Sequence, residues 1–126
     1  MNDINSVALP AEAVKQLVVH ALDVLKAEDI IVLDVSNHAN FTDVMILASG
    51  HSTRHVNAIA DSVIDATKIA GVAPISIEGE SVGEWVLIDF GDIVVHVMLP
   101  ATRAFYELEK LWGGPVVNQP KQQFNP

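Results

Sequence analysis

Apolar residues recur along the chain at a spacing typical of helices in two segments. Residues 11–27 (AEAVKQLVVHALDVLKA) and 53–70 (TRHVNAIADSVIDATKIA) carry them three and four positions apart, which predicts two amphipathic helices. Pro10 favours the first turn of the earlier helix, while Ser52 suits the N-cap of the later one, which Gly71 ends. The positions predicted to face the core are Val14, Leu17, Val18, Ala21, Leu22, Leu25, Val56, Ile59, Ala60, Val63, Ile64 and Thr67.

Five further segments are rich in β-branched residues and predict strands. They are residues 29–35, 43–49, 73–79, 84–90 and 92–99. A closing helix is predicted over residues 102–112, and its inward positions are Ala101, Phe105, Leu108 and Trp112. This order predicts one α/β domain over residues 10–112, with a single mixed sheet of about five strands flanked by helices. We expect a flexible N-terminus at residues 1–9 and a disordered tail at residues 113–126.

The stretch GEWVLIDFGDIVVHVML, residues 83–99, predicts a hairpin with a two-residue turn at Gly91-Asp92. This turn places Phe90 opposite Ile93 and thereby sets the register of both strands. One face is then uniformly apolar and is predicted to face the core: Val86, Ile88, Phe90, Ile93, Val95 and Val97. The other face carries the cross-strand pairs Trp85 with Met98, Leu87 with His96, and Asp89 with Val94.

This second face is too apolar for a purely solvated surface and too polar for a core. If a helix of the same chain covers it, His96 and Asp89 are satisfied polar groups at its margin. If it is partly open, Trp85 and Leu87 form an apolar patch rimmed by carboxylates, which is typical of a protein-binding surface. The residue pattern alone leaves both interpretations open.

The charge distribution narrows the class of partner. The chain has 16 Asp and Glu against 7 Lys and Arg, and its formal net charge is −9. No Lys or Arg occurs between Lys68 and Arg103, whereas five acids do: Glu78, Glu80, Glu84, Asp89 and Asp92. Because affinity for nucleic acid comes mainly from cationic side chains, we expect no direct sequence-specific binding of nucleic acid. An acidic surface favours basic partners, although solubility alone also explains it.

The absence of cysteine and the short apolar runs indicate in which cellular compartment the protein is expected. The chain contains no cysteine, which excludes disulfides and thiolate metal sites and fits a reducing compartment. No apolar run approaches the about 20 residues of a membrane span, and no basic and apolar leader opens the chain. We therefore expect a cytoplasmic protein that does not interact with membranes.

The segment ASGHSTRH, residues 48–55, raises the possibility of a nucleotide site. It places Gly50 and hydroxyl groups between a strand and a helix N-terminus, where backbone N–H groups can hold a phosphate. Nucleotidyl transfer would also require two carboxylates alternating on one strand to hold Mg²⁺. Asp89 and Asp92 are separated by the turn and do not meet this requirement, so the pattern disfavours catalysis. Nucleotide binding or a residual nucleotidyltransferase activity at the Gly50 loop is the alternative function.

Two histidines in the same segment could share one helix face. His51 and His55 are four positions apart, but the segment lacks the Glu that follows the first His in zinc hydrolases, and no third ligand is close in sequence. Polar residues at a helix start explain them better than a metal site. We expect no catalytic residue, no metal and no cofactor.

Four blocks of sequence, in order, resemble one known family. They are residues 29–35 (DIIVLDV), 42–61 (TDVMILASGHSTRHVNAIAD), 78–98 (EGESVGEWVLIDFGDIVVHVM) and 102–112 (TRAFYELEKLW). Together they are similar to the ribosomal silencing factor family, also called RsfS or iojap-like. The resemblance implies a nucleotidyltransferase-like topology without the catalytic carboxylate pattern.

The resemblance also implies a function and a binding surface. Members bind the large ribosomal subunit through ribosomal protein fourteen on the intersubunit face, block subunit joining and lower translation under nutrient limitation; they are often homodimers in isolation. Trp85 matches the tryptophan of the family's EGxxxxxW block, so the resemblance makes it the central contact residue. The other predicted contact residues are Leu87, Asp89 and Met98 on the strand face, and Glu78, Glu80 and Glu84 at its rim. Arg103, Tyr106 and Glu109 match the family's R-x-x-Y-x-L-E block, for which helix packing is an equal alternative.

Overall fold

The computed structural model describes residues 9–37 and 42–107 of the chain. The helices and strands in this part are α1 (Ala11–Val24), β1 (Glu28–Asp34), β2 (Val44–Ser49), α2 (Thr53–Ile69), β3 (Ser76–Glu78), β4 (Trp85–Asp89), β5 (Ile93–Met98) and α3 (Pro100–Tyr106). Their order is the one predicted from the sequence. Residues 1–8, 38–41 and 108–126 lie outside the described part, and so do the predictions for the N-terminal residues 1–8 and the tail 113–126.

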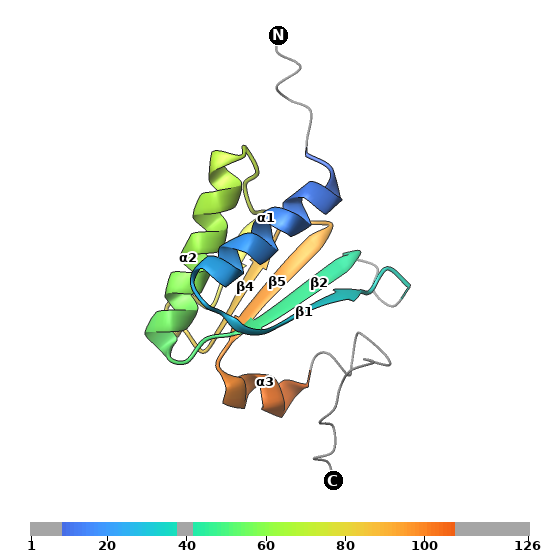
Figure 1. Cartoon of the computed structure of the whole chain (residues 1–126). Helices are drawn as coiled ribbons and strands as arrows, with labels where there is room; N and C mark the ends of the chain where they lie inside the picture. Colours follow the sequence, from blue (N-terminus) through green and yellow to red (C-terminus); the bar gives the residue numbers. More distant parts are fainter. Residues whose placement is uncertain (1–8, 38–41, 108–126) are drawn as a thin grey trace.

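The strands form one five-stranded sheet in the order β1-β2-β5-β4-β3 (Figure 1). β2 and β5 run parallel at its centre, while the other neighbouring pairs are antiparallel. The chain passes from β2 to the parallel β5 through α2 and the two strands at the far edge. The predicted α/β fold with one mixed sheet is therefore confirmed.

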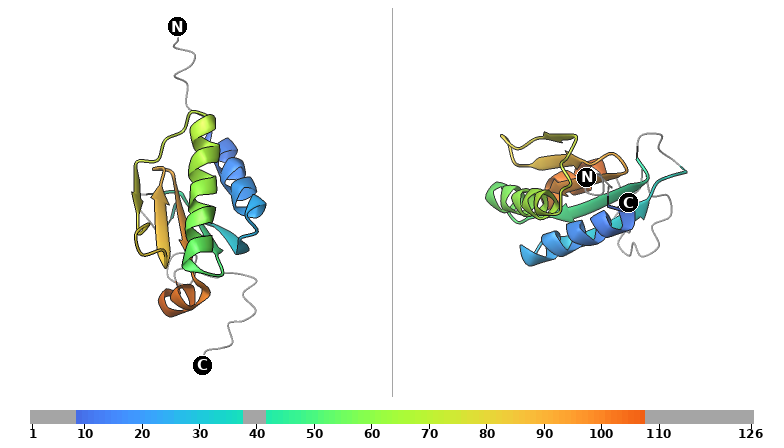
Figure 2. Two further views of the ribbon diagram at one scale, coloured as in Figure 1. Left: turned by 90° about the vertical axis from the view of Figure 1, so that its left-hand side faces the viewer. Right: turned by 90° about the horizontal axis from the view of Figure 1, so that it is seen from above.

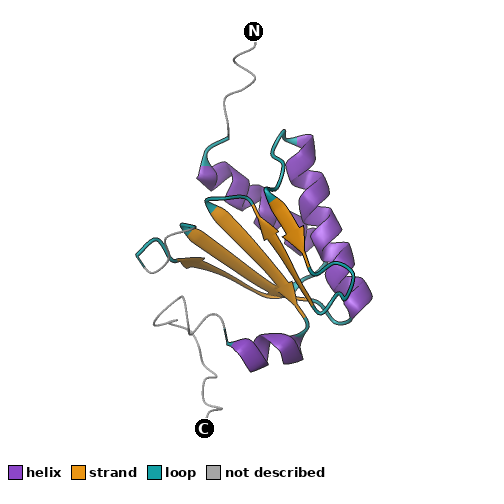
Figure 3. Ribbon diagram, turned by 180° about the vertical axis from the view of Figure 1, so that it is seen from behind, coloured by secondary structure: helices purple, strands orange, loops and turns teal. Residues whose placement is uncertain are grey.

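The two long helices pack against each other on one face of the sheet (Figures 1 and 2). The main core lies between them and the sheet, and its helix residues are Val14, Val18, Ala21, Leu22, Val56, Ile59, Ala60 and Val63. Leu17, Leu25 and Ile64, also predicted to face inward, are half-buried. Seen from behind, the opposite face of the sheet has no described helix along its length, and α3 lies at one end (Figure 3). None of the described helices combines the length and apolarity that a membrane-spanning segment requires.

The β4–β5 hairpin has the predicted register. Across the turn, the Phe90 N–H donates to the Ile93 carbonyl at 2.8 Å. The cross-strand pairs are those expected from the sequence: Trp85 with Met98, Leu87 with His96, and Asp89 with Val94. The alternate face joins the main core, through Val86, Ile88, Ile93, Val95, Val97 and the partly buried Phe90. The turn and the alternation of apolar residues therefore determine which side chains point away from the helices.

The closing helix differs from the prediction in its length and in its inward face. It begins at Pro100 and ends at Tyr106, because Glu107 has a left-handed backbone with φ +48. Ala101 and Phe105, predicted to face inward, are exposed, and the buried side chain of α3 is Arg103. The spacing of apolar residues shows which positions share a face, but the buried Arg103 decides which face turns inward. Leu108 and Trp112 lie outside the described residues.

The loop after β3 approaches the β4 backbone closely at Gly79. This residue has φ +92, and a Cβ atom at its position would overlap the Trp85 carbonyl oxygen. The Gly79 carbonyl accepts the N–H groups of Val82 and Gly83, at 3.2 and 2.9 Å. A glycine is thus required to lay the loop of residues 79–84 on the start of β4. The same positive φ ends β3 at Glu78, one residue before the predicted end, and the strand begins at Ser76, three residues after the predicted start.

We expect Gly79→Ala to lower the free energy of unfolding by roughly 3 kcal/mol, because it adds a steric overlap to the strain of a positive φ. Gly71→Ala is the matched control: Gly71 has φ +85, but a Cβ atom added there would meet nothing within 4 Å. The control should lose only about 1 kcal/mol from backbone strain. Urea unfolding of both variants measures the difference, and equal losses would show that the loop shifts freely.

Candidate functional site

Trp85 begins β4, and its indole ring is held from two sides. Its Nε1 donates to Nδ1 of His96 on β5 at 2.9 Å. The ring also packs against Tyr106 of α3, with 4.7 Å between the ring centroids and 49° between the planes. The side chain is half-buried, so part of the ring stays accessible. Trp85 therefore presents an aromatic surface in a defined orientation.

An open groove lies beside Trp85, between the loop of residues 79–84 and α3. It has a volume of about 450 Å³ and is lined by Gly79, Val82, Glu84, Trp85, Ala101, Thr102, Phe105 and Tyr106. Three of its apolar side chains are strongly exposed: Val82 is 62 % accessible, Phe105 78 % and Tyr106 49 %. We call these lining residues the aromatic groove. Clustered exposed apolar side chains are typical of a surface that binds another molecule.

Carboxylates lie along one side of the aromatic groove. Glu84 lines it directly and is the one charged side chain among the lining residues that the structure describes. Glu78 and Glu80 are exposed at the end of β3 and in the loop that follows. A cationic partner would be attracted to this rim, while its apolar groups could be buried against the aromatic rings.

The sequence leaves open whether the second face of the β4–β5 hairpin is covered or partly open, and the structure shows some of each. On β5 its side chains are buried, since Val94 is 4 % accessible, His96 5 % and Met98 0 %. On β4 its side chains are half-buried: Trp85, Leu87 and Asp89. Met98 joins a second apolar cluster, whose other buried members are Leu33, Val35, Met45 and Leu47. The face is therefore covered along β5 and partly open along β4.

The predicted contact residues divide into accessible and buried ones. Glu78, Glu80, Glu84 and Tyr106 are exposed, and Trp85, Leu87 and Asp89 are half-buried. One carboxylate oxygen of Asp89 accepts the Gly91 N–H at 2.8 Å, so this residue also closes the hairpin turn. Glu109 lies outside the described residues.

Met98 and Arg103 require a correction, because both are buried and neither offers a surface to a partner. Met98 packs in the second apolar cluster together with Trp85. Arg103 is 7 % accessible, and its Nη1 donates to Ser49 Oγ at 3.0 Å. This contact ties α3 to the end of β2. Both residues support the surface from beneath.

Five residues of the aromatic groove are not among the predicted contact residues: Gly79, Val82, Ala101, Thr102 and Phe105. The helical spacing of Phe105 predicts a core position, whereas the structure turns this side chain outward. Val82 lies in a loop that has no periodicity, so nothing in its neighbourhood indicates exposure. One sequence feature could have indicated this groove. Gly79 in the family's EGxxxxxW block predicts a close approach of the backbone beside Trp85.

The strand–helix junction at Gly50 uses two of its backbone N–H groups internally, those of Gly50 and His51. The Gly50 N–H donates to the Met98 carbonyl at 3.0 Å, and the His51 N–H donates to Nδ1 of His55 at 2.8 Å. Ser52 caps α2 as predicted, because its Oγ accepts the His55 N–H at 3.1 Å. A Cβ atom at Gly50 would lie 3.0 Å from a backbone nitrogen in the first turn of α2. The glycine thus permits close packing, and the N–H groups of Gly50 and His51 are not available to a phosphate.

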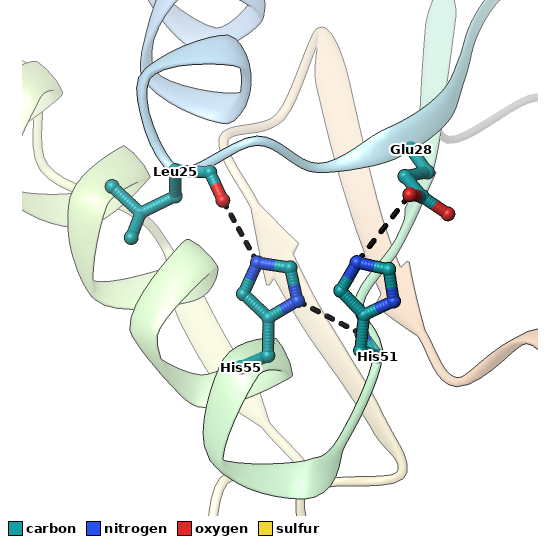
Figure 4. A network of polar contacts seen from close by, with 4 residues as sticks. All are labelled: Leu25, Glu28, His51 and His55. Carbon is teal, nitrogen blue, oxygen red and sulfur yellow. Dashed lines mark hydrogen bonds and ion pairs between the residues drawn. The ribbon is translucent and has the colours of Figure 1, made fainter.

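Two neighbouring histidines, His51 just before α2 and His55 in its first turn, contact the end of α1 and the start of β1 (Figure 4). Their rings stack with 4.9 Å between centroids. Since Nδ1 of His55 accepts a hydrogen bond, its Nε2 carries the proton and donates to the Leu25 carbonyl at 2.8 Å. Nε2 of His51 lies 3.3 Å from a Glu28 carboxylate oxygen. Within residues 9–37 and 42–107, no three His, Asp or Glu side chains are grouped to hold a metal ion.

His96 is a buried histidine in an apolar setting. Leu47 and Leu87 are its direct neighbours on the two adjacent strands. Burial lowers the pKa of His96 from 6.5 to about 4, so the ring is neutral at pH 7. An indole N–H can only donate, so Nδ1 of His96 is the acceptor and Nε2 carries the ring proton.

The free energy of unfolding is expected to fall as the pH drops from 6.5 to about 4, because the unfolded chain then binds a proton at His96 that the folded chain does not. The full loss of unfolding free energy is roughly 3 kcal/mol. Urea unfolding at about pH 7 and about pH 5 measures slightly more than half of this loss, about 2 kcal/mol, without protonating many carboxylates. His96→Asn keeps an acceptor at the Nδ1 position and does not titrate, so its stability should depend less on pH. The same pH dependence in both proteins would contradict the assignment.

Comparison with known proteins relates these features to a family. A family model described as "Ribosomal silencing factor during starvation" matches residues 8–125. The "Ribosomal silencing factor RsfS" of Chromobacterium violaceum is 48 % identical over 103 residues, which cover 82 % of this chain and 84 % of that protein. A crystal structure of a Chromobacterium violaceum protein has a TM-score of 0.82 and 47 % identity, with 84 % of this chain and 88 % of that chain covered.

The similarity extends to a mitochondrial protein. "Mitochondrial assembly of ribosomal large subunit protein 1" of Mus musculus is 40 % identical over 89 residues, which cover 68 % of this chain and 39 % of that protein. The bacterial relative matches over most of its length, whereas the mouse protein has a large part without a counterpart here. The family resemblance of the four sequence blocks is confirmed. The chain belongs to the ribosomal silencing factor (RsfS) family.

Proposed function

We propose that this protein binds the large ribosomal subunit through ribosomal protein fourteen, on the face that meets the small subunit. By occupying that face in the cytoplasm it blocks subunit joining and lowers translation under nutrient limitation. The proposal makes the protein a regulatory factor and not an enzyme. The observation that carries it is the aromatic groove with its carboxylate rim, in a chain whose bacterial relatives are named ribosomal silencing factors. The name of the mouse relative refers to the ribosomal large subunit.

The groove has the two properties that binding to a basic ribosomal protein requires. Trp85, Phe105 and Tyr106 supply aromatic area that loses its contact with water on binding, and such residues contribute most of the affinity at protein interfaces. The exposed Glu80 and Glu84 supply negative charge, which speeds the encounter with a cationic surface.

Self-association of the free protein is part of the same proposal. A homodimer formed through the aromatic groove would cover Phe105 and Tyr106 until a ribosomal partner competes for them. Light scattering over a dilution series detects such a dimer. Phe105→Ala should shift the equilibrium to the monomer, whereas Ile69→Ala, an exposed substitution on α2, should not.

Nucleotide binding at the Gly50 junction is the alternative, and the structure gives it less support. The N–H groups of Gly50 and His51 already have acceptors within the protein. ATP with Mg²⁺ is expected to leave the melting temperature unchanged, and a clear rise would revive the alternative.

We expect Trp85→Ala to weaken binding to the purified large subunit at least about thirtyfold, because it removes the central aromatic contact of the groove. Co-sedimentation with separated subunits at physiological salt measures binding, and the yield of joined ribosomes measures the block. Ile69→Ala is the control, since Ile69 is 88 % accessible and lies on α2, on the helical face of the sheet. Wild-type binding by the Trp85 variant would show that the groove is not the site.

Reversal of the rim charge should act mainly on the rate of association. Glu80→Lys with Glu84→Lys is expected to slow association about tenfold at low salt, and the effect should shrink as salt screens the charges. Asp65→Lys with Asp61→Lys on exposed α2 positions changes the net charge equally and should have a smaller effect. Stopped-flow measurement of association provides both rates. Equal slowing by the two pairs would indicate that only net charge matters.

A further inference from the structure

We infer that His96 is a positioning residue, whose Nδ1 holds the indole of Trp85 in the orientation that the aromatic groove presents to its partner. The inference rests on the proposed function, because it concerns the same surface. His96 is 5 % accessible and lies on β5, so it acts through Trp85 and does not itself touch the partner.

The two contacts of Trp85 together define the orientation of its ring. The hydrogen bond to His96 holds the Nε1 edge toward β5, with 5.8 Å between the ring centroids. Tyr106 packs on the ring from α3, on the side of the groove. A half-exposed tryptophan without the hydrogen bond could turn its N–H toward water, and the groove would lose its preformed wall. An orientation set before binding reduces the entropy that is lost on association.

The residues directly beside His96 in the sheet offer its imidazole no other hydrogen-bond partner. Its direct cross-strand neighbours are Leu47 and Leu87, which offer no side-chain hydrogen bond. Trp85 lies on β4 at a position diagonal to His96 on β5, so its long aromatic side chain can reach the imidazole. The low pKa of His96 keeps its ring neutral at pH 7, so that Nδ1 is available as an acceptor. If His96 did not orient Trp85, an apolar residue of similar size could replace it without consequence for binding.

Two substitutions at this position separate the acceptor from the bulk of the ring. His96→Leu fills much of the volume but removes the acceptor, whereas His96→Asn retains an acceptor one bond from Cγ. We expect His96→Leu to weaken binding to the large subunit about tenfold and His96→Asn to remain within about threefold of the wild type. Circular dichroism and thermal unfolding establish that each variant is folded.

A double-mutant cycle distinguishes positioning from general support of the fold. Trp85→Phe retains an aromatic ring but removes the donor, so His96→Leu should change the affinity less than about twofold in that background. A purely structural role of His96 would give the same loss with Trp85 and with Phe at this position. That result would overturn the inference.

The indole N–H provides a test that needs no ribosome. In the full chain with Trp112→Phe, the one remaining indole belongs to Trp85, and its N–H resonance reports the hydrogen bond to His96. We expect slow exchange with water when His96 is present, and exchange at least about tenfold faster in His96→Leu. Fast exchange with His96 present would overturn the inference, and this measurement also decides the matter if His96→Leu does not fold.

The failure of the inference can be told from the failure of the proposed function. If the wild type does not bind the large subunit, the proposed function is wrong, whereas a protected indole N–H would still support the positioning of Trp85. If the wild type binds and His96→Leu binds equally well with an unprotected indole N–H, the proposed function stands and the inference is wrong.

Discussion

The pairing of β4 with β5 is the constraint on which the rest of the surface depends. Its register places one set of side chains in the core under α1 and α2 and leaves the alternate set for the other face. A shift by one residue would exchange the two sets, and the apolar core would be lost. The hydrogen bond from Trp85 to His96 requires the same register, because it joins diagonal positions of the two strands. Stability of the fold and orientation of the Trp85 ring therefore have one cause.

The hairpin can be predicted from the sequence because its determinants are local. Gly91-Asp92 marks the turn, and the alternation of apolar residues on either side is sufficient to assign the faces. The closing helix cannot be predicted in the same way. Its inward face depends on Arg103, whose hydrogen-bond partner Ser49 lies 54 residues earlier in the chain. The spacing of apolar residues within a short segment carries no information about such a distant contact. A prediction from spacing alone therefore places Phe105 in the core.

The polar groups of the molecule are used in two different ways. Around Gly50, the N–H groups of Gly50 and His51 and both ring nitrogens of His55 have partners within the chain. These contacts join the β2–α2 connection to β5, and α2 to the α1–β1 connection. Along the aromatic groove, the carboxylates of Glu80 and Glu84 face solvent. Groups of the first kind hold elements together, whereas groups of the second kind are exposed to solvent. The exposed apolar rings beside those carboxylates distinguish the groove from an ordinary solvated surface.

The contact between Arg103 and Ser49 also affects the stage of protein synthesis at which the aromatic groove can form. One wall of the groove comes from residues 79–85 and the other from α3, which follows all of the strands in the chain. A growing polypeptide that ends before Pro100 has Trp85 but lacks the opposite wall, and its Ser49 lacks the guanidinium. Both walls of the groove are therefore present only once α3 has been synthesised, so that a nascent chain ending before Pro100 does not yet carry the groove.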